Sequence, residues 1–155
     1  MLQTALAMRT TTLRLGTAVL VLPWHNPVLL AEQAATPDLI SGGRFDFGIG
    51  KGYRHNEFAG FRISPEEAVP RFEESVEVMT KAFVSRSRFS HRGKFWQFDD
   101  IVVEPPPSQK PHPPFWVAAA SEASLRKAAR RGSNLSRVQY ASPEVLGQRI
   151  PLYRD

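Results

Sequence analysis

A single lysine lies between two glycines at the end of an apolar segment of the chain. Gly48, Gly50 and Gly52 alternate with Ile49 and Lys51. This spacing is neither the dinucleotide fingerprint, which requires GxGxxG at the opening of a helix, nor a P-loop. Glycines let a backbone approach a ligand closely, and a lysine held among them can meet a phosphate with its ammonium group. We therefore take Gly50, Lys51 and Gly52 as candidate phosphate-binding residues; the alternative is a plain turn with a solvated lysine.

Two serines form a second candidate anion site. Ser121 and Ser124 are three residues apart at the predicted start of a helix, so both hydroxyls can converge on its first turn. That turn already presents unpaired N–H groups and the positive end of the helix dipole, which favour an anion. The alternative is that Ser121 only caps the helix.

Other residue types suggest contacts but no catalytic group. The small residues from Gly16 to Val19 leave room for a flat ring, with ordinary core packing as the alternative. His25 and His55 follow predicted strands and are candidates for contact with a substrate, although each is also explained as a surface residue. The four histidines lack metal spacing, and no Ser-His-Asp order predicts a triad. The catalytic residue stays unassigned and no metal is expected.

These residues depend on a strand–helix–strand unit. Residues 13–22 predict a first strand, and its second half is apolar at every position, as in a parallel strand buried on both faces. Asn26 caps a helix over residues 27–40, which ends at Ser41-Gly42-Gly43. Residues 44–50 predict a second strand, so the three elements make a βαβ unit.

The rest of the chain continues the alternation. Ser64 and Glu67 predict a capping box, Pro70 is expected to reset or kink the helix start, and residues 71–84 repeat apolar positions at helical spacing. A hairpin is predicted to turn at residues 91–94, followed by a short strand, Ile101 to Val103.

The last part of the chain predicts two more strands and two more helices. A buried strand at residues 115–120 passes into a helix at 121–131, a further strand starts at 133, and a last helix starts at Ser142. Alternating strands and helices predict an α/β fold, and the small residues at the strand ends favour a (β/α) barrel over an open sheet. In both architectures, ligands bind at the carboxyl ends of the strands.

The length and composition of the chain exclude several classes of function. The chain has 155 residues, enough for one domain, with 42% hydrophobic residues and a net charge of +5. It has no cysteine, hence no disulfide, thiol nucleophile or cysteine metal site, which fits a cytoplasmic protein. No apolar run approaches the roughly 20 residues that span a bilayer. The positive charge suits anionic small molecules, and no motif predicts nucleic-acid binding.

Several segments together resemble the luciferase-like monooxygenase family. They are residues 15–23, 26–28 and 41–52, Phe98-Asp99-Asp100, Lys110-Pro111-His112-Pro113-Pro114, and Ala120-Ser121. The resemblance implies a (β/α)8 barrel of the TIM type, of about 300 residues. It places this chain at about strands 3 to 6, as one partial domain over residues 1–155 with an insertion at about 86–114. We therefore expect this chain alone to be a fragment, to be unstable, or to be completed by another chain.

The resemblance also implies a cofactor and its contacts. Family members bind reduced FMN, or in one branch a deazaflavin coenzyme. Lys51 would meet the cofactor phosphate, Ser121 and Ser124 would add hydroxyl contacts, and Ala18–Val19 would lie against the flavin ring through a non-proline cis peptide. Ala120 replaces a glutamate of the luciferase, so that contact is lost.

The activity implied is a flavin-dependent monooxygenase that uses O2 and an organic substrate, with the flavin supplying the redox chemistry. The alternatives are a deazaflavin-dependent dehydrogenase or reductase and a non-catalytic flavin- or phosphate-binding module. A flavin reductase as a partner and a homodimer for the full-length protein are further expectations.

Overall fold

The computed structural model describes residues 1–136 and 142–154. Five short parallel strands in this part of the chain form one sheet, in the order β1-β3-β6-β7 with β2 also paired to β3. They are β1 (Leu15–Gly16), β2 (Leu20–Val21), β3 (Phe45–Gly50), β6 (Phe115–Ala118) and β7 (Asn134–Ser136). Two antiparallel strands, β4 (Phe89–Arg92) and β5 (Gln97–Ile101), form a separate hairpin.

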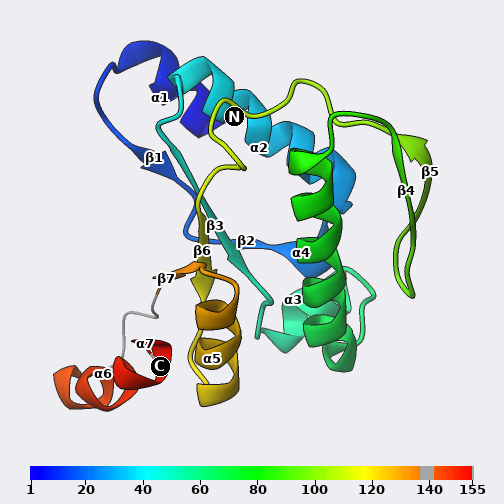
Figure 1. Cartoon of the computed structure of the whole chain (residues 1–155). Coiled ribbons are helices and arrows are strands. Elements are labelled where there is room, and N and C mark those ends of the chain that lie inside the picture. Colours follow the sequence, from blue (N-terminus) through cyan, green and yellow to red (C-terminus); the bar gives the residue numbers. More distant parts are fainter. Residues whose placement is uncertain (137–141, 155) are drawn as a thin grey trace.

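The described helices alternate with these strands. They are α1 (Leu2–Arg9), α2 (Pro27–Ser41), α3 (His55–Gly60), α4 (Ala68–Val84), α5 (Glu122–Arg130), α6 (Pro143–Arg149) and α7 (Pro151–Arg154), with 3-10 turns at Leu22–Trp24 and Pro65–Glu67. Figure 1 shows α4 between the parallel strands and the hairpin, with α3 and α5 near the end of the sheet where β3 and β6 finish. None of these helices is long and apolar enough to cross a membrane.

The first predicted strand is split in two, which corrects the sequence interpretation. β1 and β2 each pair in parallel with β3, but residues 17–19 between them leave the ladder. The hydroxyl of Thr17 donates to the carbonyl of Gly48 at 2.7 Å, and the Ala18–Val19 peptide is cis. A uniformly apolar run carries no signal for such an interruption, since its hydrophobic pattern is unchanged.

The helix between these strands forms as predicted. The side chain of Asn26 accepts hydrogen bonds from the amides of Val28 and Leu29, at 3.0 and 3.2 Å. Gly42 ends the helix in the left-handed conformation, with φ of +66°. The βαβ unit is therefore present, with β2 as an additional short strand.

The start of α4 differs from the predicted capping box. The hydroxyl of Ser64 accepts from the amide of Glu66 at 3.3 Å, and the carboxylate of Glu67 instead pairs with Arg71 at 2.7 Å. A 3-10 turn precedes Ala68, where the α-helix begins, and Pro70 lies within the first turn of that helix. The predicted apolar face is buried, with Phe72, Val76, Val78, Met79, Ala82 and Phe83 in the core.

The hairpin is present, but it turns slightly later than predicted. The amide of Gly93 donates to the carbonyl of Trp96 at 2.9 Å, so the turn follows Arg92. β5 ends at Ile101, and the predicted strand from Ile101 to Val103 is wrong. The carboxylate of Glu74 on α4 accepts from the amides of Phe95 and Trp96, at 3.1 and 2.7 Å, and ties the turn to the helix.

The last part of the chain keeps the predicted order with shifted bounds. β6 ends at Ala118, two residues early, and α5 begins after Ser121. β7 and α6 follow as predicted, and the hydroxyl of Ser142 accepts from the amide of Val145 at 3.4 Å. The predicted last helix is interrupted before α7, and its end at Asp155 lies outside the described residues.

The core lies between the sheet and the helices that cover it. Phe45, Phe47 and Ile49 of β3 are buried, and α2 packs against α4 over them. Phe47 faces Phe115 of β6 at a ring-centroid distance of 5.9 Å. The predicted α/β class with a parallel sheet is therefore confirmed.

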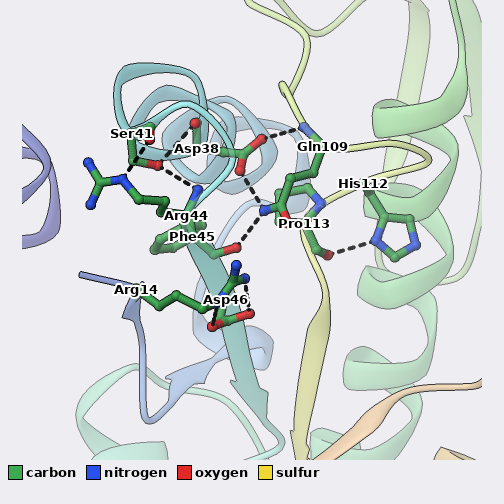
Figure 2. A network of polar contacts seen from close by, with 9 residues as sticks. All are labelled: Arg14, Asp38, Ser41, Arg44, Phe45, Asp46, Gln109, His112 and Pro113. Carbon is green, nitrogen blue, oxygen red and sulfur yellow. Dashed lines mark hydrogen bonds and ion pairs between the residues drawn. The ribbon is translucent and has the colours of Figure 1, made fainter. Parts of the chain in front are cut away.

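At the amino ends of the strands, a polar network ties the segment before β6 to α2 and β3 (Figure 2). The carboxylate of Asp38 is fully buried and accepts from the backbone amide of Gln109 at 2.9 Å and from its side-chain amide at 2.6 Å. That side-chain amide also donates to the carbonyl of Phe45 at 2.7 Å. Arg44 donates to the carbonyls of Thr10 and Ala7, at 2.7 and 3.2 Å, and fixes the α1–β1 connection.

Candidate functional site

The carboxyl ends of β3 and β6 bring the two predicted anion-binding segments to one edge of the sheet. The two strands pair in parallel, with Ile49 opposite Val117. Lys51 follows β3 directly, and Ser121 follows β6 by three residues. Parallel neighbours necessarily finish at the same edge, so the sheet itself sets the two segments side by side.

A cavity of about 150 Å³ lies at this edge, and Lys51, Ser121 and Ser124 all contribute to its lining. Its other walls come from α4, β6 and α5: Val69, Phe72, Glu73, Val117, Ala118, Ala123, Lys127, Ala128 and Arg131. One lysine and two hydroxyls, which the sequence places 70 or more residues apart, therefore share one concave surface.

The two serines form a reciprocal cap at the start of α5. The hydroxyl of Ser121 accepts from the amide of Ser124 at 3.3 Å, and the hydroxyl of Ser124 accepts from the amide of Ser121 at 3.1 Å. Ser124 also donates its proton to the carbonyl of Ser121 at 2.8 Å. The two hydroxyl oxygens are 3.0 Å apart. Ser121 therefore does cap the helix. Its hydroxyl proton can be donated either to the hydroxyl oxygen of Ser124 or to a ligand.

The positive charges of the cavity are not equivalent. Lys127 and Arg131 both pair with the carboxylate of Glu73, and the distance from the Lys127 ammonium is 3.4 Å. Within residues 1–136 and 142–154, Lys51 forms no hydrogen bond or ion pair. The Lys51 ammonium therefore lies at this cavity without an ion-pair partner in the described chain.

The glycines around Lys51 have a packing role. A Cβ on Gly48 would lie 1.7 Å from the carbonyl oxygen of Thr17, and one on Gly50 would lie 2.8 Å from Cγ2 of Val19. Gly52 has φ of +77°, a conformation that other residues rarely adopt. The close approach that these glycines permit is to the chain's own residues 17–21. Contact of Gly50 and Gly52 with a cofactor stays a prediction.

The segment proposed to lie against a ring is next to this loop. Val19 is half-buried beside Gly50, while Ala18 is exposed. The predicted cis peptide at Ala18–Val19 is present. Contact of Ala18 and Val19 with a flat ring stays a prediction.

The two histidines occupy different environments. His25 is half-buried directly after the 3-10 turn, and this burial lowers the pKa of its imidazole, which favours the neutral form at pH 7. His55 is exposed at the start of α3. Neither lines the cavity that holds Lys51 and Ser121. Their proposed contact with a substrate stays a prediction.

Sequence reasoning missed three residues that line this cavity and one buried polar group outside it. Lys127 and Arg131 follow Ser124 at spacings of three and seven, which places them on the same face of a helix, so their position was available from the sequence. Glu73 and Trp24 carried no such signal. Trp24 stacks on Phe61 with ring centroids 4.9 Å apart, and its indole N–H is the one buried side-chain polar group in the described chain without a partner.

The fold and the cavity define a parallel α/β chain that brings one lysine and two serines together at the carboxyl ends of its strands. The chain belongs to the luciferase-like monooxygenase family, whose model matches residues 1–155. The predicted fold class, a (β/α)8 barrel of the TIM type present in part, is confirmed by this membership and by the likeness to a solved structure. Its structure resembles the crystal structure of monooxygenase RslO1 from Streptomyces bottropensis, with a TM-score of 0.92 and 35% identity, over 99% of this chain and 47% of that one.

Two characterised relatives use different cofactors. The chain is 37% identical over 134 residues to the oxygenase component of a flavin-dependent trigonelline monooxygenase from Acinetobacter baylyi, which covers 84% of this chain and 36% of the relative. It is 33% identical over 132 residues to an F420-dependent glucose-6-phosphate dehydrogenase from Segniliparus rotundus, which covers 83% of this chain and 38% of the relative. The chain thus spans less than half the length of the relatives it matches.

Proposed function

We propose that this chain forms the phosphate-binding part of a flavin-dependent monooxygenase that uses reduced FMN and O2 on an organic substrate. One observation supports this most directly: Lys51, Ser121 and Ser124 line a single cavity at the carboxyl edge of the sheet. Family membership and the flavin-dependent relative agree with the proposal. The deazaflavin-dependent relative supports an oxidoreductase of the same family with a different cofactor.

The donors at this edge fit a phosphate group. An ammonium without a partner in the described chain, a hydroxyl proton and the free amides in the first turn of α5 all offer positive charge to one volume. The cavity volume of about 150 Å³ is below the range of about 300–1,000 Å³ in which whole small ligands are held. It therefore suits one end of a cofactor, with the remainder outside.

The residues of this chain would bind and orient the cofactor. Lys51 would offset the phosphate charge, and Ser121 would direct its proton at a phosphate oxygen. Ala18 and Val19 would support one face of the ring. When bound, the flavin supplies the redox chemistry, and the protein supplies position and exclusion of water.

The partners follow from this proposal. A small organic substrate and O2 are the reactants, and a flavin reductase would supply reduced FMN. A homodimer of the full-length protein and a cytoplasmic location remain predictions from the sequence. The second candidate, a deazaflavin-dependent dehydrogenase or reductase, would use the same phosphate cavity.

The test compares FMN with riboflavin, which lacks the phosphate group. We expect the full-length protein that contains this chain to bind FMN at least about tenfold more tightly than riboflavin, because tenfold corresponds to about 1.4 kcal/mol from the phosphate contacts. Fluorescence quenching of the flavin measures both dissociation constants, and coenzyme F420 tested in parallel separates the second candidate. Equal affinity for FMN and riboflavin would refute the phosphate site. If neither FMN nor coenzyme F420 binds, both candidates fail.

A consumption assay separates an enzyme from a binding module. With a flavin reductase and NADH present, the full-length protein should consume O2 in a substrate-dependent manner. A protein that binds FMN without such consumption is the non-catalytic module.

A further inference from the structure

The face of the parallel sheet opposite the core carries mainly small residues. Side chains alternate between the two faces of a strand, so the buried Phe45, Phe47 and Ile49 lie in the core and the residues between them point the other way. A Cβ on Gly50 would lie 3.7 Å from Cβ of Ala118, so these two residues share this inner face. The inner-face residues of β3 and β6 are Asp46, Gly48, Gly50, Trp116 and Ala118, among which Trp116 has the one large side chain.

This inner face leaves space toward the carboxyl ends of the strands. Gly50 and Ala118 are the last residues of β3 and β6, and neither has a side chain larger than a methyl group. Residues 17–19 cross the face next to Gly48 and Gly50, where added Cβ atoms would collide with them. Bulky branched residues usually fill the interior of a barrel, so the small ones here leave room for a ligand that enters at the carboxyl edge.

Trp116 lies at the inner limit of this space. It is paired with Gly48, one inner-face position before Ala118. Its indole N–H donates to the carboxylate of Asp46, two residues nearer the amino end of β3. The Arg14 guanidinium donates to the same carboxylate at 2.7 and 2.9 Å (Figure 2), so the acceptor is fixed and the indole leans toward the amino ends of the strands. Trp116 is 37% exposed, and this exposed surface faces the inner side of the sheet.

The strand order sets where a substrate would meet this indole. Ala18 and Val19 lie between β1 and β2, on one side of β3, and β6 lies on its other side. A flavin ring supported on one face by Ala18 and Val19 would therefore turn its other face toward β6. A substrate that reacts at that free face would lie next to Trp116.

We propose that Trp116 is a specificity-determining residue that forms the floor of the substrate site and limits how deeply a substrate enters the barrel. Because Asp46 accepts its N–H, the indole offers a substrate carbon surface and no hydrogen-bond donor. The site therefore favours a short apolar or aromatic group at the inner end of the substrate and excludes a long one. Asp46 and Arg14 are positioning residues for the indole. This inference rests on the proposed function, because it requires the flavin ring at residues 18–19.

The test uses 4-methylphenol and 4-butylphenol as probes of different length on the full-length protein with oxidised FMN bound. Absorption changes of the bound flavin measure both dissociation constants. We expect wild-type protein to prefer the methyl compound by at least about tenfold, and Trp116→Ala to reduce that ratio by about tenfold, because removal of the indole admits the longer chain. Trp96→Ala is the matched control, since it removes an indole whose N–H is also hydrogen-bonded, to Ser75 at 3.1 Å, but at the hairpin turn.

Trp116→Phe retains an aromatic ring if the alanine variant fails to fold, and it removes the donor to Asp46. A reduced ratio in both variants supports the proposal and the role of Asp46, and a reduced ratio in Trp116→Ala alone supports closure by the volume of the ring. An unchanged ratio in every Trp116 variant that folds, no response to either probe, or an equal reduction in Trp96→Ala overturns the proposal. If the protein binds FMN no better than riboflavin, the phosphate site fails instead, and the ratio measured with either flavin bound still decides the role of Trp116.

Discussion

The two ends of the parallel sheet use polar groups in opposite ways. At the amino ends, Asp38, Arg44 and Gln109 satisfy one another or nearby carbonyls within the chain. At the carboxyl ends, Lys51 forms no ion pair within residues 1–136 and 142–154, and the Ser121 proton is shared with a neighbouring hydroxyl. Hydrogen-bond donors that are paired within the protein contribute to its stability, whereas donors without a partner in the protein are available to bind a ligand.

This difference predicts separable effects of mutation. Changes in the amino-end network should alter unfolding and leave the preference for FMN over riboflavin intact. Changes at the carboxyl end should alter that preference and leave unfolding nearly intact.

The largest expected effect is on stability, from Asp38→Ala. Removing the carboxylate takes one acceptor from the half-buried backbone amide of Gln109 and one from its side-chain amide, which keeps only the carbonyl of Phe45, at about 1–3 kcal/mol each, so we expect a loss of about 3 kcal/mol. Urea denaturation followed by circular dichroism measures it. Asp99→Ala is the control, because Asp99 pairs with Arg92 on the exposed hairpin, where an ion pair contributes about 0–1 kcal/mol. A loss below that of Asp99→Ala would contradict the structural role.

The next effect is on binding, from Lys51→Ala. A charge-assisted contact contributes about 1.5–3 kcal/mol, so FMN affinity should fall by roughly 10–100-fold while riboflavin affinity stays the same. The control is Lys94→Ala, which removes an exposed lysine that lies over the Phe95 ring in the hairpin. Equal losses for FMN and riboflavin would show that Lys51 acts on the ring or the fold, and an unchanged FMN affinity would remove it from the site.

Much of the fold was predictable because its signals are local. Asn26, Gly42 and Ser121 act on the backbone within three or four residues of themselves, so the sequence identifies the helix ends they form. The apolar face of α4 repeats at helical spacing and marks its buried side. These features needed no knowledge of the tertiary structure.

The features that sequence reasoning missed depend on contacts between distant segments. The break between β1 and β2 involves the contact of Thr17 with Gly48. One wall of the cavity at Lys51 involves the ion pairs of Glu73 with Lys127 and Arg131. Glu67 was assigned to a capping box because its spacing from Ser64 fits, but Arg71 competes for its carboxylate. The convergence of Lys51 with Ser121 was anticipated from the strand ends, whereas their shared cavity required coordinates.

Ser121 caps α5 and also lines the cavity, so its variants test whether one residue contributes both to stability and to FMN binding. Ser121→Ala should cost about 1 kcal/mol of stability through loss of the helix cap. Ser121→Asp retains a capping oxygen and adds negative charge, so stability should stay near wild type while FMN affinity falls. Thermal unfolding and FMN titration of both variants distinguish the roles. If Ser121→Asp binds FMN as wild type does, the serine is a cap alone.

The smallest expected effect concerns Glu74, a carboxylate that the chain satisfies completely. Burial raises the pKa of Glu74, but hydrogen bonds from the amides of Phe95 and Trp96 and from His91 outweigh it, so the net pKa lies below the ordinary value of 4.5. A carboxylate with a lowered folded-state pKa contributes stability that is fully present above 4.5 and is lost as pH falls through the lower folded value. Glu74→Gln should therefore flatten the acid side of the stability curve.

Denaturation midpoints measured from neutral pH down through this range provide the test. Glu77→Gln is the matched control, since Glu77 lies on the same helix one turn away and is exposed. Because Glu74 does not line the cavity that holds Lys51 and Ser121, its replacement should leave the FMN-to-riboflavin ratio unchanged. If the stability of Glu74→Gln falls as steeply with decreasing pH as that of wild type, the contact between α4 and the hairpin turn does not depend on the charge of this carboxylate.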